Sequence, residues 1–330
     1  MSKFEERLLS IWYGGRKPGL TLRALSILYG AVMRMRRAAY RRGWLRVHRV
    51  GVPVIVVGNI TVGGSGKTPL VIALVESLRE QGWSPGVVSR GYGRRSRRQH
   101  DVRADTSPEE GGDEPVLIAR RCGVPVVVDA DRVAAARRVV QLGGDIVVAD
   151  DGLQHYRLHR DIEIEVVDGV RRHGNGWLMP AGPLRESARR AEACDLHVVN
   201  GGAAHAGEWQ SHLHGDTLKG NDGRTQPLEA LRGRRVHAVA GIGDPQRFFG
   251  YVRMQGIEAV EHAFADHHVY RPQDLQFKED LPIVMTEKDW VKCAAFARPD
   301  SWSLPVRAGL EDGFHVALSR LLPTRTGATR

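Results

Sequence analysis

Cysteine is scarce in this chain of 330 residues, and long apolar runs are missing from it. The three cysteines, Cys122, Cys194 and Cys293, lie far apart and form neither a CxxC pair nor a metal-binding pattern, which favours a reducing compartment. No run approaches the ~20 apolar residues that cross a bilayer. The N-terminus also lacks the apolar core and cleavage site of a signal peptide. We therefore expect a cytoplasmic protein.

Acidic residues are rare in the first fifty residues. This part holds 12 Lys or Arg and 2 Asp or Glu, whereas the other 280 residues hold 36 of each charge, so the whole net charge of +10 lies near the N-terminus. A nucleic-acid binder would carry an excess of basic residues on its main body. The imbalance argues against such a protein. It predicts that a basic segment near the N-terminus has a local binding role.

One stretch, residues 54–68 (VIVVGNITVGGSGKT), has the pattern of a phosphate-binding loop. Its first four residues form an apolar run, typical of a parallel strand that is covered on both faces. The glycines that follow can adopt positive φ, so that successive backbone N–H groups turn toward an anion. Lys67 suits the β- and γ-phosphates, and the hydroxyl of Thr68 suits Mg²⁺. The expected nucleotide-binding residues are Gly63, Gly64, Ser65, Gly66, Lys67 and Thr68.

One position departs from the general pattern of such loops. The pattern has glycine five residues before Gly66, where this chain has Thr61. The alternative is a glycine-rich turn with an incidental lysine. Because an apolar strand precedes the loop and a helix is expected after it over 70–81, the phosphate-binding interpretation is favoured.

A second apolar strand, expected over 145–149, ends in Asp150-Asp151-Gly152. An aspartate at the carboxyl end of a strand beside a phosphate-binding loop can hold Mg²⁺ directly or through water. The two motifs together are more specific for a nucleotide site than either one alone. His155 follows closely enough to reach the same crevice, although a single histidine could equally be structural.

Two loops carry further candidate groups. Asp113 and Glu114 follow a glycine pair and precede a helix through residue 121, where they could also be ordinary N-terminal helix acids. Asp266 and His267 stand in the loop ADHH. The metal interpretation of this loop is weak because no third ligand is evident, and a carboxylate beside a histidine suits proton handling.

Residues 20–42 predict an amphipathic helix with Leu25, Leu28, Tyr29, Val32 and Met35 on one side. Its C-terminal end is rich in arginine. An apolar stripe beside an arginine cluster suits an anionic membrane surface, where each nearby cation contributes ~1 kcal/mol. The alternative is a docking helix whose arginines are solvated and complement the helix dipole. The sequence does not decide between the two.

The length of the chain favours two domains. Residues 1–50 form the basic segment, 51–205 a domain that contains the phosphate-binding loop, 206–233 a polar linker with a possible hairpin, and 234–330 a smaller α/β domain. Further strands are expected at 86–89, 125–129, 162–167, 196–200, 236–240, 257–262 and 282–285. Helices are expected at 132–142, 245–255 and 288–297 and after Arg185, and residues 324–330 are expected to be frayed.

Nine short motifs in a fixed order resemble the tetraacyldisaccharide 4′-kinases, the lipid A kinases of Gram-negative bacteria. They lie between about Leu22 and Leu310, and they are VGNITVGGSGKTP, SRGYGR, GGDEP, DADR, DDGLQH, PAGPLRE, HAVAGIGDPQRFF, FADHHVY and MTEKDW. The threonine at position 61 belongs to this family's own loop. The resemblance implies two α/β/α sandwich domains with the site between them, the first of the P-loop NTPase type with a mostly parallel sheet.

The resemblance also implies a reaction and its residues. It implies ATP-dependent transfer of the γ-phosphoryl group to the 4′-hydroxyl of a tetraacyldisaccharide 1-phosphate, at the cytoplasmic face of the bacterial inner membrane. We expect no nucleic acid as a partner, and no protein partner is evident. Lys67 and Thr68 match residues that hold the nucleotide phosphates and Mg²⁺, and Asp150 and Asp151 match the metal region. Asp113 matches the catalytic base, assisted by His267. The other matching crevice residues are Glu114, His155, Arg185 and Asp266.

Two other functions fit part of the pattern. A membrane-associated P-loop ATPase switch would explain the loop, the acidic strand end and the basic helix, but it gives no reason for Asp113 or for an Asp-His pair in the other domain. A nucleic-acid module is disfavoured because charge beyond residue 50 balances to zero.

Overall fold

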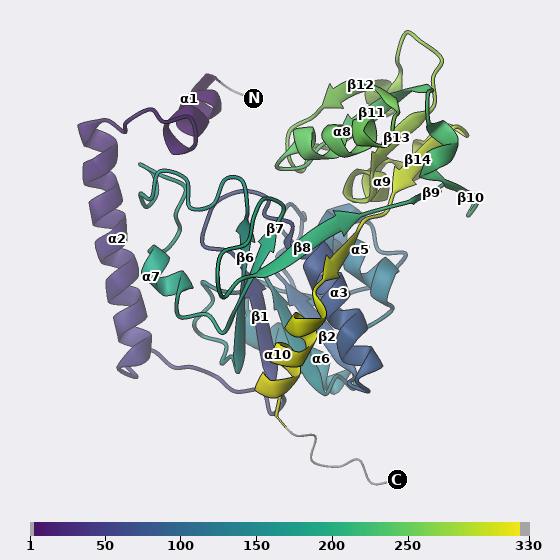
Figure 1. Ribbon diagram of the computed structural model, residues 1–330. Coiled ribbons are helices and arrows are strands. Elements are labelled where there is room, and N and C mark those ends of the chain that lie inside the picture. The colour runs from purple at the N-terminus through teal and green to yellow at the C-terminus, as the bar shows by residue number, and fades with distance from the viewer. Residues whose placement is uncertain (1–2, 324–330) are drawn as a thin grey trace.

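The computed structural model describes residues 3–323, which form two α/β bodies and an N-terminal helical arm (Figure 1). The expectation for residues 324–330 lies outside this part of the chain. The fold class expected from the sequence is confirmed, since each body is a mainly parallel sheet with helices on both faces.

The larger sheet has nine strands in the order β15-β8-β7-β6-β1-β5-β2-β4-β3. The seven strands from β8 to β4 are parallel, and the edge strands β15 and β3 are antiparallel to their neighbours. β1 lies at the centre and is buried throughout, as its apolar sequence predicts. The bounds are β1 Val54–Gly58, β2 Pro85–Ser89, β3 His100–Val102, β4 Val126–Val128, β5 Ile146–Asp150, β6 Ile162–Asp168, β7 Leu196–Asn200, β8 Trp209–His214 and β15 Arg307–Leu310.

Helices cover both faces of this sheet. α3 (Lys67–Glu80), α5 (Asp113–Cys122) and α10 (Asp312–Leu321) share a core with alternate β1 residues Ile55 and Val57. α6 (Arg132–Gln141) packs against the other face, with Val54 and Val56. Two short helices, α4 (Pro108–Gly111) and α7 (Ala188–Ala191), lie in connections.

The smaller body is a six-stranded sheet in the order β10-β9-β14-β13-β11-β12. α8 (Pro245–Met254) covers one face and α9 (Glu287–Cys293) covers the other. The strands are β9 Thr217–Lys219, β10 Thr225–Pro227, β11 Arg235–Ala240, β12 Glu258–Ala263, β13 Ile283–Thr286 and β14 Ser301–Leu304, with 3-10 turns at Leu228–Leu231, Pro272–Leu275 and Ala294–Phe296.

The observed connections differ from the expected domain boundaries. Strand β8 falls in the expected linker, yet it pairs with β7 in the larger sheet. After β14 the chain returns to the first body, where β15 pairs with β8 and α10 joins the core. The two bodies are therefore joined by two crossings, one after β8 and one before β15, as Figure 1 shows.

The helix expected from Arg185 begins three residues later and is short. Residues 185–187 are not helical, and α7 begins only at Ala188. The backbone N–H of Arg185 donates to the carbonyl of Ile60 at 2.6 Å, and Leu184 forms a bridge with Thr61. This segment is therefore tied to the loop after β1, which prevents a helical turn there.

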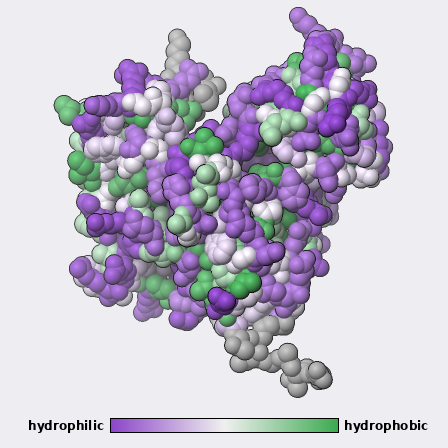
Figure 2. Space-filling model, viewed as in Figure 1, coloured by the Kyte–Doolittle hydropathy of each residue, from purple (hydrophilic) through white to green (hydrophobic). Residues whose placement is uncertain are grey.

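Two helices form the N-terminal arm, α1 (Lys3–Trp12) and α2 (Leu20–Arg41). The hydroxyl of Ser26 donates to the backbone carbonyl of Leu178 at 2.7 Å, and the hydroxyl of Tyr29 donates to the backbone carbonyl of Arg185 at 2.9 Å. Tyr29 therefore faces the protein, contrary to its expected place on the apolar stripe. The rest of the stripe is exposed (Figure 2), and its members, together with two neighbours, are Leu20, Leu25, Ile27, Leu28, Val32 and Met35. Within residues 3–323, no helix is long and apolar enough to span a bilayer.

Candidate active site between the two domains

The glycine-rich loop runs from the end of β1 into α3. Gly66 takes a left-handed conformation with φ of 80° and directly precedes α3, which begins at Lys67 and has Pro69 in its first turn. The side chain of Asn200 donates to the carbonyl of Ser65 at 3.1 Å, and a Cβ atom on residue 66 would lie 1.8 Å from Nδ2 of Asn200. Close approach and positive φ both require glycine here. The buried hydroxyl of Ser65 has no hydrogen-bond partner within residues 3–323.

Lys67 is held at the carboxyl edge of the larger sheet. Its Nζ donates to Oδ1 of Asn59 at 3.2 Å and lies 3.6 Å from Oδ1 of Asp151. Asp151 also pairs with Arg185 at 3.1 Å. Burial opposes the ionisation of Asp151, but Lys67 and Arg185 outweigh it and lower the pKa of this carboxyl below its ordinary value. Lys67 is thus fixed in direction by two oxygen partners.

Asp150, the last residue of β5, is a buried acid with unused hydrogen-bonding capacity. Its Oδ2 accepts from the hydroxyl of Ser89 at 3.3 Å, whereas its Oδ1 has no partner in the described part of the chain. Burial, together with the charges of Glu114 and Asp151, raises the pKa of Asp150 to about 7. A divalent cation would relieve this repulsion, so the donor set fits a hard cation that prefers oxygen ligands.

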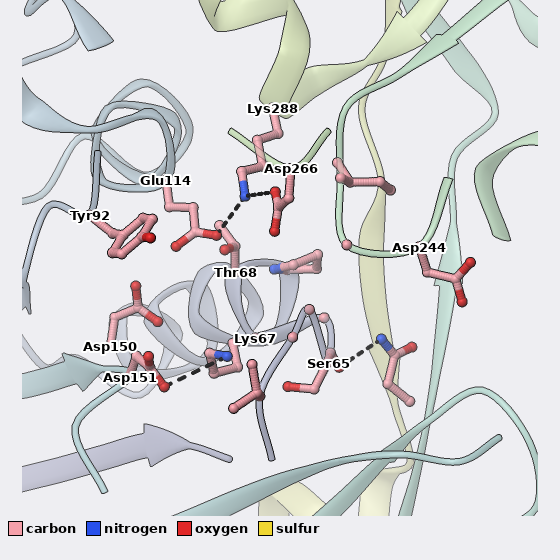
Figure 3. A pocket seen from close by; sticks show the side chains of 18 of the residues that line it. Ser65, Lys67, Thr68, Tyr92, Glu114, Asp150, Asp151, Asp244, Asp266 and Lys288 are labelled. Carbon is pink, nitrogen blue, oxygen red and sulfur yellow. Dashed lines mark hydrogen bonds and ion pairs between the residues drawn. The ribbon is translucent and has the colours of Figure 1, made fainter. Parts of the chain in front are cut away.

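No cluster of three or more His, Cys, Asp or Glu side chains in the described residues has the geometry of a preformed metal site. Mg²⁺ commonly takes only one or two carboxylates, with nucleotide phosphates and water as its other ligands. Figure 3 shows Asp150 and Asp151 close to Lys67 and Thr68 at the start of α3. A bound Mg²⁺ would therefore need oxygen ligands from the nucleotide in addition to those of the protein.

Asp113 and His267 come from different bodies and meet between them. Nδ1 of His267 lies 3.0 Å and 3.2 Å from the two carboxylate oxygens of Asp113. Burial opposes the ionisation of Asp113, but His267, Lys288 and Lys292 together lower its pKa to about 2. Burial also opposes a charged imidazole, yet the bond to Asp113 raises the pKa of His267 above its ordinary value. Because the carboxyl is ionised, Nδ1 carries the hydrogen and donates it to Asp113.

Lys288 connects two acids across the same junction. Its Nζ lies 2.9 Å from Oε1 of Glu114 on α5 and 3.1 Å from Oδ1 of Asp266 (Figure 3). Burial of Lys288 opposes its charge, but Glu114 and Asp266 outweigh the burial and raise its pKa. The acid Glu114 on the larger body is thereby tied to the Asp266-His267 loop of the smaller body.

These groups surround one cavity of about 1470 Å³. Its wall runs from Tyr29, Met33 and Arg36 of α2 past the glycine-rich loop to the smaller body. Burial, followed by Arg132, lowers the pKa of His155 to about 4, so that its imidazole is neutral near pH 7. The lining residues thus include arginines near α2 as well as the acids and lysines described above.

The cavity brings together most of the residues that the sequence predicts. Those that line it are Gly63, Gly64, Ser65, Gly66, Lys67, Thr68, Glu114, Asp150, Asp151, His155, Arg185, Asp266 and His267. Asp113 is the exception, because it lies behind His267, is only 6% exposed and does not line the cavity. The sequence did not single out Asn59, Asn200, Lys288 or Lys292, which bind other site residues. Lys288 stands in the quoted motif MTEKDW, and that motif was the only signal for it.

Comparisons with known proteins agree with this arrangement. The family model described as tetraacyldisaccharide-1-P 4′-kinase matches residues 19–323. Tetraacyldisaccharide 4′-kinase of Xanthomonas euvesicatoria pv. vesicatoria is 56% identical over 332 residues, which cover 96% of each chain. That of Stenotrophomonas maltophilia is 56% identical over 319 residues, which cover 93% of this chain and 94% of the relative. Among solved structures, LpxK from Aquifex aeolicus in complex with ATP has a TM-score of 0.76 and 30% identity, covering 91% of this chain and 98% of that one.

The glycine at position 66 gives a direct test of the loop geometry. We expect Gly66→Ala to lower the midpoint of thermal unfolding by ~2 °C or more, because a strained left-handed residue costs ~1–3 kcal/mol even before its contact with Asn200 is counted. Gly64→Ala is the matched control, because its Cβ atom would meet the nearest atom of Gly243 at an ordinary 3.5 Å. Equal midpoints for the two variants, measured without nucleotide, would contradict the geometry.

Proposed function

The chain belongs to the family of tetraacyldisaccharide-1-P 4′-kinases, and from this premise we propose how its residues carry out the reaction. The protein is an ATP-dependent kinase of lipid A biosynthesis, which phosphorylates the 4′-hydroxyl of a tetraacyldisaccharide 1-phosphate. One observation carries the proposal. The glycine-rich loop with Lys67 belongs to one body and His267, which binds Asp113, belongs to the other, yet both face the same cavity.

The glycine-rich loop holds the nucleotide. Backbone N–H groups of residues 63–68 surround the phosphates, and Lys67 neutralises charge on the β- and γ-phosphates while Asn59 and Asp151 fix its direction. Thr68, Asp150 and Asp151 are the residues that would hold Mg²⁺. Bound there, the ion would supply charge neutralisation on the phosphate oxygens. The unused Oδ1 of Asp150 supports the ion at this place, and the unpartnered hydroxyl of Ser65 supports a phosphate in the loop.

The pair of Asp113 and His267 handles the proton. The family resemblance implied Asp113 as the base with His267 as its helper. Asp113 is shielded from the cavity and its pKa is about 2, so it is a poor acceptor, whereas His267 lines the cavity. We therefore assign the 4′-hydroxyl proton to Nε2 of His267, while Asp113 holds Nδ1–H and stabilises the imidazolium that forms. The 4′-oxygen then bonds to the γ-phosphorus as the bond to ADP breaks.

The arginines that line the cavity suit an anionic acceptor. Arg185, Arg132 and Arg36 line it around the neutral His155, and Met33 adds an apolar surface from α2. Arg132 is almost fully buried, and its Nε has no hydrogen-bond partner among the described residues. A phosphate of the acceptor would satisfy this donor, since arginine binds phosphate with several N–H groups. The acceptor's sugar 4′-hydroxyl would then point toward His267.

The exposed face of α2 docks on the membrane that holds the acceptor. Its apolar residues are solvent-exposed, and its arginines gather at the C-terminal end, which fits an anionic lipid surface. The same helix borders the cavity through Tyr29, Met33 and Arg36. We place this docking at the cytoplasmic face of the inner membrane, where ATP and a membrane-embedded acceptor meet. The protein would be peripheral there.

The kinase assignment is tested by product formation with two variants. Purified protein with Mg-ATP and a tetraacyldisaccharide 1-phosphate in detergent should give the 4′-phosphate. Asp113→Ala should keep ATP affinity within about threefold and lose ~10²-fold or more in turnover, because it removes only the group that orients His267. Lys67→Ala should lose much of both, because it removes the cation on the phosphates. ATP binding is measured by calorimetry.

Two results would contradict that assignment. Wild-type protein that is folded and binds ATP but yields no 4′-phosphate would remove the kinase function. Equal and strong loss of ATP binding in both variants would remove the separate role of Asp113.

Membrane docking is tested on the exposed face of α2. We expect the double variant Leu28→Glu, Val32→Glu to bind vesicles of phosphatidylethanolamine and phosphatidylglycerol at least ~10-fold more weakly, because it places two acids on the apolar surface. Val316→Glu on α10 is the control, since Val316 is similarly exposed at 52% but lies on another part of the molecule. Unchanged vesicle binding of the double variant, with thermal stability retained, would disprove docking through this face.

A further inference from the structure

A buried lysine stands behind the catalytic pair. Nζ of Lys292, on α9 of the smaller body, lies 3.7 Å from Oδ2 of Asp113 and 3.1 Å from Oδ1 of Asp289. It also lies 5.2 Å from the centre of the Tyr270 ring. We propose that Lys292 is a positioning residue of the phosphoryl transfer, which fixes the Asp113 carboxylate behind His267. This inference rests on the function proposed above.

Lys292 is itself held by a rigid anchor. Asp289 is fully buried, and its Oδ2 accepts from the backbone N–H of Gly241 at 2.8 Å and from the hydroxyl of Thr286 at 2.6 Å. Asp289 and Lys292 are three residues apart on α9, so they face the same side of the helix. Because Asp289 is bound to the residue that follows β11 and to the N-cap residue of α9, the ammonium group is fixed relative to the core of the smaller body.

The surroundings of Lys292 indicate that its charge acts on Asp113. Only 11% of its side chain is exposed, and its Nζ makes no hydrogen bond within residues 3–323, although it faces two carboxylates. A lysine that served only to tie Asp289 to its own helix would have no need to reach the other body. Instead, Oδ2 of Asp113 lies 3.0 Å from Nδ1 of His267 in its own smaller-body loop and 3.7 Å from Nζ of Lys292 on α9.

A second ion pair between the same two helices serves as a structural comparison. Arg121 of α5 and Glu287 of α9 pair at 2.9 Å with side chains 10% and 15% exposed. This pair joins the two bodies without touching Asp113 or His267. Loss of Arg121 should therefore weaken the junction between α5 and α9 while the catalytic pair keeps its geometry.

The role follows from the tautomer that the reaction needs. The ionised Asp113 carboxylate, held in place by Lys292, keeps the hydrogen of His267 on Nδ1, so that Nε2 is free to accept the 4′-hydroxyl proton. Without that cation the carboxylate is less well placed and the imidazolium is stabilised relative to neutral imidazole, because a neighbouring positive charge has gone. The other charged groups around the pair are Asp266, 3.9 Å from Nε2 of His267, and Lys288, which binds Asp266 and lowers the pKa of Asp113. Turnover should therefore fall, and the acid limb of its pH profile should move to higher pH.

The test uses the full chain with Mg-ATP and the lipid acceptor. We expect Lys292→Met to lower kcat by ~10-fold or more, to leave KM for ATP within about twofold, and to move the acid limb of the kcat profile to higher pH by about half a unit. Lys292→Arg should restore the position of the acid limb and part of kcat. Arg121→Met should lower the midpoint of thermal unfolding while leaving the acid limb unmoved.

The outcomes separate this inference from the proposed function. If wild-type protein forms no 4′-phosphate, the function itself fails. If wild-type protein is active and Lys292→Met loses only thermal stability, with kcat and the acid limb unchanged, Lys292 is structural and the inference is overturned. Should Lys292→Met fail to bind ATP as wild type does, Lys292→Gln is measured by the same criteria.

Discussion

The contact between Asp113 of the larger body and His267 of the smaller one is the interaction on which the proposed active site depends. Neither body holds a complete site, since the glycine-rich loop and the acids of β5 belong to one and the histidine belongs to the other. The bond also fixes the orientation of the imidazole, so that one nitrogen is engaged and the other is available. Catalysis of this kind gains chiefly from groups that are correctly placed before the substrate arrives.

The junction around this contact is built from buried ion pairs. Three acid-base pairs join α5 with α9: Arg121 with Glu287, Glu114 with Lys288, and Asp113 with Lys292. Each of these charges loses hydration on burial, so the net stabilisation from such pairs is small, whereas removal of one partner leaves an uncompensated buried charge. The main effect of these pairs is therefore to fix the position of the two bodies relative to each other. They also hold two site residues, Asp113 and Glu114, in place.

Local chemistry made much of this site predictable from sequence. The strand, glycine-rich loop and helix over residues 54–80 follow from backbone conformation and apolar patterning, and Asp150 follows from its place at a strand end. Tertiary contacts account for what was missed. The return of β15 and α10 to the first sheet depends on pairing with β8, which is distant in sequence. Arg185 is non-helical because its backbone binds Ile60, and Lys292 gains its importance only when α9 packs beside α5.

The central claim is that Asp113 of one body controls the protonation of His267 in the other. It is tested most directly by ¹⁵N NMR of histidine-labelled protein, with the His267 signal assigned by its loss in His267→Gln. In wild-type protein the imidazole of His267 should titrate above its ordinary pKa of 6.5, since Asp113 stabilises the charged form. In Asp113→Asn the midpoint should move to lower pH, because a neutral amide cannot stabilise the imidazolium. An identical midpoint in both proteins would contradict the account.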